Sequence, residues 1–130
     1  MDLDRHYKLN SYLALIFGSL IIIGETYRRY GEWGHWSRWL DDLIIGLFLI
    51  VPAILIVKGH KYGRKLIIGG WGFSSGLLYG SFFSSKVTDV NNIGQSNIDS
   101  TVLICLIGLA FITASLSLIW LMFIEKSTSK

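Results

Sequence analysis

The sequence predicts an all-α integral membrane protein whose four transmembrane helices form a small bundle. Composition is the first indication, because 52% of the 130 residues are hydrophobic and only 16% are charged, whereas about a quarter are charged in soluble domains. The second indication is that the hydrophobic residues come in blocks instead of periodic faces. Four blocks contain no Lys, Arg, Asp or Glu: 9–24, 43–57, 66–83 and 102–124.

Each block predicts one membrane span within a single domain, 1–130. A helix needs about 20 residues to cross the hydrocarbon core, so the first two blocks must extend into their flanks. The first reaches that length if its helix continues through Glu25 to about Arg28, and the second if Ser37 caps a helix that begins at Arg38. The expected spans are approximately 9–28, 38–57, 64–84 and 100–124.

The distribution of basic residues predicts the orientation. Four spans place the N-terminus, the segment 58–65 and the C-terminus on one side of the membrane, and eight Lys and Arg residues lie there against four on the other. The positive-inside rule then predicts that both termini are cytoplasmic. The membrane expected is the cell, or inner, membrane. A net charge of +3 arranged around apolar spans needs no nucleic-acid partner.

Small residues recur every fourth position in the third span. Gly72, Gly76, Gly80 and Ser84 form a stripe on one helix face, which favours close packing of two helices inside this bundle or between copies of it. The partners expected are therefore the lipid bilayer and a second copy or another membrane protein. In the same span, Trp71 is expected to donate its indole N–H in a helix-helix hydrogen bond.

Ionisable residues inside a membrane are the first candidates for function, and the spans place none at mid-depth. The nearest acids, Glu25, Asp41 and Asp42, are expected at the extracytoplasmic rim near His35. Asp41 and Asp42 can be present without a ligand, because the helix dipole stabilises acidic residues in the first turn of a helix. Glu25 can be present without a ligand because it can pair with Arg28 or Arg29. The functional alternative is that Glu25, His35, Asp41 and Asp42 form a ligand or ion site. Tyr79 and Trp71 are further candidates for residues that line it.

Sequence patterns for catalysis, metal binding or cofactors do not occur. The three histidines are scattered and Cys105 is the only cysteine, so a disulfide, a CxxC pair or a three-histidine site within one chain is not expected. Neither nucleophile triads nor nucleotide-binding loops are recognisable. We therefore expect no catalytic residue, no bound metal and no cofactor.

Aromatic residues surround the link between the first two spans. Rings at every third position cannot share one helix face, so the pattern predicts two helix ends that meet at a bend over 31–34. Tyrosine and tryptophan at such ends are typical of the membrane interface. The expected anchors are Tyr27, Tyr30, Trp33, Trp36 and Trp39 on the outer side and Trp120 on the inner side.

Three classes of function are compatible with these features. The first is an interaction protein, either an accessory subunit or a self-associating bundle, which the glycine stripe favours. The second is an oligomeric transporter or channel for a small ion or solute that uses Glu25 and Asp42. The third is a membrane-surface enzyme or a lipid- or cofactor-binding protein with its site at His35, the rim acids and the tryptophans.

Overall fold

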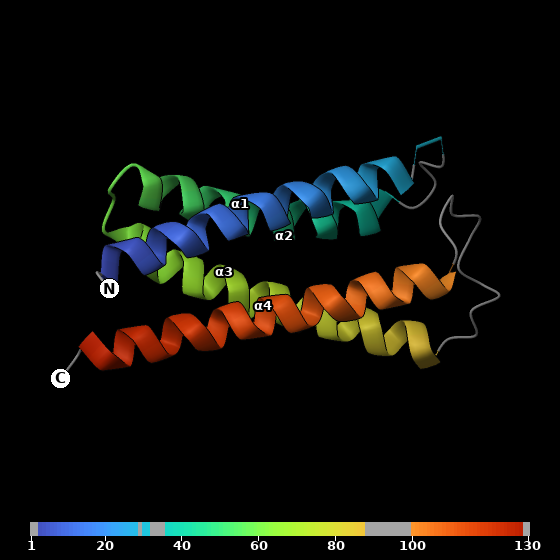
Figure 1. Ribbon diagram of the computed structural model, residues 1–130. Helices are drawn as coiled ribbons and strands as arrows, with labels where there is room; N and C mark the ends of the chain where they lie inside the picture. The colour runs from blue at the N-terminus through green and yellow to red at the C-terminus, as the bar shows by residue number, and fades with distance from the viewer. Residues whose placement is uncertain (1–2, 29, 32–35, 88–99, 129–130) are drawn as a thin grey trace.

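Four long helices make up the fold. The computed structural model describes residues 3–28, 30–31, 36–87 and 100–128. The helices are α1 (Leu3–Arg28), α2 (Trp36–Val57), α3 (Tyr62–Val87) and α4 (Ser100–Thr128), and they run up and down so that α1 begins and α4 ends at the same end of the bundle (Figure 1). Each helix is long and apolar enough to cross a membrane, so the prediction of a four-helix membrane bundle is confirmed.

Glycines in the left-handed conformation follow the ends of α1 and α2. Gly31, which follows α1, has a φ of +95°, and Gly59, which follows α2, has a φ of +80°. At the end of α2 the N–H of Gly59 donates to the carbonyl of Ile56 at 2.9 Å and that of His60 to the carbonyl of Leu55 at 2.9 Å. These two bonds form a Schellman motif, which requires the left-handed conformation that glycine adopts without strain.

The start of α2 differs slightly from the prediction. The helix begins at Trp36, so Ser37 lies inside its first turn and is not the residue that precedes it. The expectation that Ser37 caps the helix is therefore wrong, because the helix begins two residues earlier than predicted. A difference of this size is within the usual uncertainty of helix ends. The end of α1 at Arg28 agrees with the prediction that the first helix continues through Glu25.

Consecutive helices pack side by side, α1 against α2, α2 against α3 and α3 against α4, whereas α1 and α4 meet only briefly. Glycine allows each of the three long contacts to be close. A methyl group at Gly18 would lie 3.0 Å from the carbonyl oxygen of Gly46, one at Gly70 would overlap the carbonyl oxygen of Phe48, and one at Gly108 would lie 2.9 Å from the Phe82 ring. Such close approach is how helices gain packing energy in lipid.

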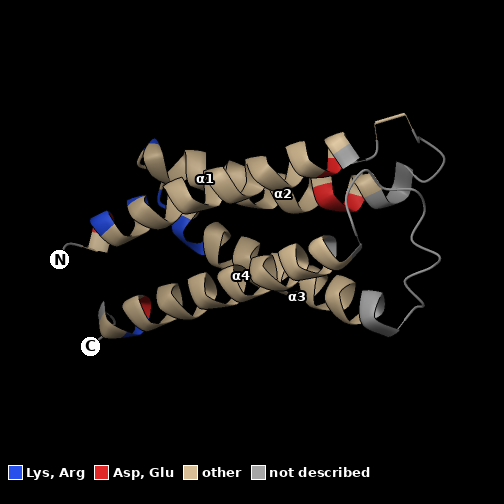
Figure 2. Cartoon of the chain, turned by 45° about the vertical axis from the view of Figure 1, so that its right-hand side comes forward, with Lys and Arg blue, Asp and Glu red and all other residues tan. Residues whose placement is uncertain are grey.

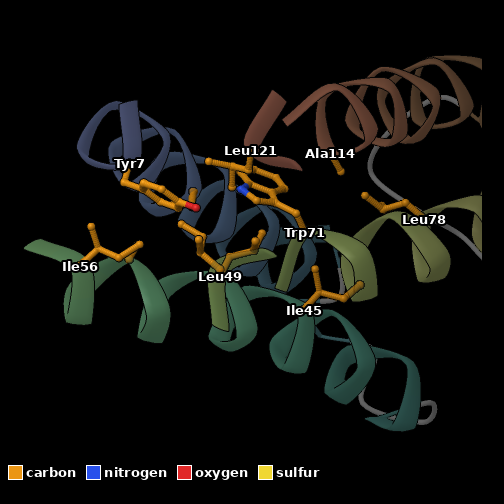
Figure 3. Close-up of a cluster of buried hydrophobic side chains, with 11 residues drawn as sticks. Tyr7, Ile45, Leu49, Ile56, Trp71, Leu78, Ala114 and Leu121 are labelled. Atoms are coloured by element: carbon orange, nitrogen blue, oxygen red, sulfur yellow. The ribbon is translucent and has the colours of Figure 1, made fainter. Parts of the chain in front are cut away.

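Trp71 occupies the centre of the buried core. Figure 3 shows its indole among Tyr7, Leu49 and Leu121, so that side chains of all four helices meet around one ring. The buried apolar residues are Tyr7, Ala14, Ile45, Leu49, Ala53, Ile56, Ile67, Trp71, Leu78, Ala114 and Leu121. In α1 and α4 the described buried side chains lie in the halves nearest the termini, between 7 and 14 and between 114 and 121.

Large apolar side chains cover the outside of the bundle. Ile16, Leu20 and Ile23 on α1 are 60 to 64% exposed, and Leu109 and Leu116 on α4 are 63% and 61% exposed. A contiguous apolar surface of this extent is unfavourable in water. The chain must therefore place these helices in the hydrocarbon of a bilayer, which is the lipid contact that the sequence predicts.

Neighbouring glycines in α3 provide a test of the packing. Gly70→Ala should lower the free energy of unfolding by about 1–3 kcal/mol, because the new methyl overlaps a backbone oxygen and forces the helices apart. Gly69→Ala is the matched control, since a Cβ there meets nothing within 4 Å. Unfolding measured by steric trapping in bicelles distinguishes the variants, and equal stability of the two would contradict the close contact between α2 and α3.

Candidate functional site

The predicted rim residues lie at the end of the bundle opposite the termini. Glu25 on α1 and Asp42 on α2 are partly buried and Asp41 is exposed, and Figure 2 shows acidic residues of α1 and α2 together at this end. Glu25 and Asp42 both have interaction partners within the chain. Because α2 begins at Trp36, its first turn holds no acidic residue, so the expectation that Asp41 and Asp42 lie in the first turn of the helix is wrong. The pairing of Glu25 with Arg28 or Arg29 stays a prediction. His35 lies outside the described residues. A binding role for this group remains a prediction.

A hydrogen bond joins α1 and α2 beside these acids. The indole Nε1 of Trp39 donates to the Thr26 hydroxyl at 3.1 Å, and that hydroxyl donates to the carbonyl of Ile22 at 2.7 Å. Trp39 thus contributes to the contact between the helices in addition to its expected place at the membrane interface. Tyr27 and Tyr30 are 66% and 79% exposed, which leaves their rings available to lipid headgroups.

The other predicted anchors and stripe residues are only partly described. Trp33 lies outside the described residues, as do the side chains of Trp36 and Ser84. Trp120, the anchor predicted for the opposite side, is 38% exposed. Among the described residues, no three His, Cys, Asp or Glu side chains come close enough together to hold a metal ion.

Tyr79 belongs to an aromatic group in the halves of α3 and α4 that lie away from the termini. Its ring centroid lies 4.5 Å from that of Phe83 and 5.8 Å from that of Phe111, and Phe82 and Phe83 are 5.5 Å apart. The Tyr79 side chain is 52% exposed. These contacts give Tyr79 a packing role between α3 and α4, whereas a role in lining a ligand path remains a prediction.

Trp71 makes the interhelical hydrogen bond that its sequence position predicts. Its Nε1 donates to Oδ1 of Asn10 at 2.7 Å, and both side chains are fully buried. The Phe17 ring packs on the same indole with centroids 5.3 Å apart. The bond joins α1 to α3, two helices that are not neighbours along the chain.

Asn10 belongs to a larger group of side chains that we call the termini-side polar cluster. Its members come from α1, α3 and α4 at the end where the chain begins and ends: Asp4, His6, Tyr7, Asn10, Arg64, Trp71, Trp120 and Glu125. The Arg64 guanidinium pairs with Asp4 and lies 5.2 Å from the centroid of the Tyr7 ring. Glu125 on α4 lies near the Tyr7 hydroxyl. Because the His6 ring of α1 also contacts the Trp120 ring of α4, the cluster connects all three helices.

Two buried nitrogen atoms of this cluster have no partner within the chain: Nδ2 of Asn10 and Nδ1 of His6. The His6 ring meets the Trp120 ring edge to face, with centroids 5.7 Å apart. A buried polar atom without a hydrogen bond is uncommon and costs about 1–3 kcal/mol. The two unpartnered atoms make this cluster a second candidate binding site beside the rim.

The sequence contained a signal for this cluster. The sequence predicts a first span that begins near residue 9, but α1 begins at Leu3, which adds nearly two turns of mostly polar residues to the helix. Tyr7, Asn10, Ser11 and Ala14 follow the three- and four-residue spacing of one helix face, and all four are buried. This spacing is the sequence signal for a buried, partly polar face at the start of α1.

Comparisons with protein-family descriptions, curated proteins and solved structures found no match to this chain. The fold alone therefore sets its class. Four apolar helices packed as a bundle make the chain a small polytopic integral membrane protein.

A double-mutant cycle measures the central hydrogen bond. We expect Trp71→Phe and Asn10→Leu to show a coupling of about 0.6–1.7 kcal/mol in the free energy of unfolding, the range found for interhelical bonds in membranes. Trp39→Phe with Thr26→Val is the matched control, because that bond is only partly buried and should couple more weakly. A coupling near zero for the first pair would show that the Trp71–Asn10 bond does not stabilise the bundle.

Proposed function

We propose that this protein is a membrane interaction protein, which associates with a second copy or with another membrane protein through the glycine-rich face of α3. The observation that carries the proposal is the direction of that face. Gly69, Gly76 and Gly80 are exposed, and a Cβ at any of them would meet nothing within 4 Å. Gly76 and Gly80 of the stripe thus have no neighbour inside the bundle, which favours packing between proteins over packing within one chain.

Helix geometry supports this assignment. The buried residues of α3, Ile67, Trp71, Ser74 and Leu78, recur at three- and four-residue spacing and define its inner face. At 100° per residue, Gly76 and Gly80 lie about 160° from Leu78. Gly72 is closer to the inner face, where a Cβ would lie 3.9 Å from a Leu118 methyl.

Exposed aromatic residues border the stripe. Phe73 and Phe83 are 39% and 45% exposed, and both lie within about a quarter turn of Gly76 and Gly80 on the helix surface. A face that carries both large rings and glycine gaps can interlock with another helix, since the rings of one fill the gaps of the other. Such packing is the main source of association energy where both helices already lie in lipid.

The distribution of charge supports the proposed orientation. In Figure 2 the described Lys and Arg residues gather at the end of the bundle that holds the start of α1, the link between α2 and α3 and the end of α4. We propose that this end faces the cytoplasm and that the protein resides in the cell, or inner, membrane. The cluster of Asp4, Arg64 and Glu125 then lies near the inner leaflet.

Association can be measured through Cys105, which is exposed and is the only cysteine of the chain. Wild-type protein labelled there with donor or acceptor dyes should show energy transfer in lipid vesicles that rises with the protein-to-lipid ratio. Gly76→Ile should weaken association at least about tenfold, equivalent to about 1.4 kcal/mol, because the larger side chain keeps the partner helix away.

Gly24→Ile is the matched control for this measurement. Gly24 is also an exposed helical glycine with nothing within 4 Å of a Cβ, but it lies on α1. We expect its association to equal that of the wild type. Wild-type protein that stays monomeric would contradict self-association, and it would also contradict an oligomeric pathway along Glu25 and Asp42. Association with a different membrane protein would then appear as a partner that copurifies with the wild type. That partner should be lost from Gly76→Ile.

The orientation has a separate test. Fusion of a fluorescent protein that matures only in the cytoplasm to residue 130 should give fluorescent bacterial cells, and fusion of a periplasmically active phosphatase should give inactive cells. The physical reason is the excess of basic residues around the termini. The reverse pattern would show that the termini are extracytoplasmic.

A further inference from the structure

We infer that the termini-side polar cluster binds a lipid-soluble molecule through a neutral carbonyl or hydroxyl oxygen, which lies between Asn10 and His6. The site is distinct from the α3 face proposed for association and does not depend on it. Three properties of the cluster lead to this inference: the donors that it leaves unpartnered, the charge of the groups around it, and the position of its outer wall.

The orientation of the Asn10 amide determines what the site can bind. Since the Trp71 indole donates to Oδ1 at 2.7 Å, the amide nitrogen must point elsewhere. Nδ2 carries two N–H donors, and it is buried without an acceptor. An N–H donor needs an electron-rich acceptor, such as an oxygen. The positive partial charge of the amide hydrogens repels a cation, including a metal ion.

His6 provides the second contact. It precedes Asn10 by four residues, so both side chains lie on the same side of α1 one turn apart, and its contact with Trp120 shows that this side faces α4. One oxygen can serve both unpartnered nitrogens. A hydroxyl accepts from Asn10 and donates to unprotonated Nδ1, whereas a carbonyl accepts from Asn10 and from Nδ1–H.

Charge favours a neutral ligand. Asp4 and Glu125 contribute two negative charges to the cluster and Arg64 contributes one positive charge, which already pairs with Asp4. Asn10 contributes a neutral amide that is fully buried, and burial of a charged oxygen without a paired cation is costly. A neutral oxygen avoids this cost and still satisfies the two buried nitrogens.

The wall of the site faces lipid. The helices α1 and α4 share only a short contact, and His6 and Trp120 form part of it. His6 is partly exposed and Trp120 is 38% exposed, so their edge-to-face pair lies at the surface of the bundle, one helical turn from Asn10. A molecule dissolved in the bilayer reaches the amide by parting these two rings, without passing through the tightly packed contacts between α1, α2 and α3.

Side-chain resonances of the protein in phosphatidylcholine nanodiscs test the site. With ¹⁵N-labelled asparagine and tryptophan, the Asn10 amide is assigned by its loss in Asn10→Asp and the Trp71 indole by its loss in Trp71→Phe. The probes are a short-chain prenyl 1,4-benzoquinone, which offers carbonyls, and dioctanoylglycerol, which offers a hydroxyl. We expect at least one probe to shift both resonances saturably.

Variants show whether the two nitrogens are responsible. Asn10→Asp keeps an acceptor for Trp71 but removes the N–H donors, and His6→Phe keeps a ring against Trp120 but removes Nδ1. Each should weaken probe binding about tenfold, as expected for the loss of one buried hydrogen bond, measured at the Trp71 indole. His60→Phe is the control, because His60 is exposed in the link between α2 and α3.

Several outcomes would overturn the inference: no shift with either probe, equal affinity in the wild type and His6→Phe, or an Asn10 amide that contacts water only. If Asn10→Asp does not fold, His6→Phe decides the result alone. Gly76→Ile separates the two proposals, since this variant should lose association and still bind the probe with wild-type affinity.

Discussion

The absence of a hydrophobic driving force between helices in lipid is the constraint on which the whole structure depends. Apolar side chains gain little by leaving lipid for the protein interior, so association must come from close packing and interhelical hydrogen bonds. The chain uses both. Glycines at 18, 46, 70 and 108 allow the close contacts, and the buried bond between Trp71 and Asn10 joins two helices that are not neighbours in the chain.

The position of the Trp71–Asn10 bond explains why only some glycines of α3 pack against another helix of the bundle. Where Gly70 contacts the backbone of α2, the adjacent Trp71 can reach across the core to α1, because the helices are near enough for one indole to span the gap. Gly69, Gly76 and Gly80 of α3 have no such internal contact and lie on the lipid-facing side of the helix. One helix thus has two faces with small residues, of which only one is satisfied within the chain.

Much of the architecture could be predicted from the sequence, because block hydrophobicity depends on local composition alone. The four helices, the end of α1 at Arg28 and the bonded indole of Trp71 agree with expectation. The direction of the glycine stripe could not be predicted, because it depends on which neighbours α3 selects. The termini-side polar cluster could not be predicted from the uncharged blocks, because Tyr7 lies between charged Arg5 and Lys8, outside the block 9–24, and yet is buried together with Asn10. Spacing on one helix face is the better criterion there.

The concentration of buried side chains near the termini has a consequence for the motions of the bundle. Local opening occurs most readily where few buried contacts must be broken. In α1 and α4 those contacts lie between 7 and 14 and between 114 and 121, so the half of the bundle near the termini acts as the rigid base. The opposite half consists of two helix pairs, α1 with α2 and α3 with α4, each held by its own contacts, such as Trp39 with Thr26 and Phe82 with Gly108. By this criterion the end of the bundle opposite the termini should open first, while the buried side chains near the termini keep the other end closed.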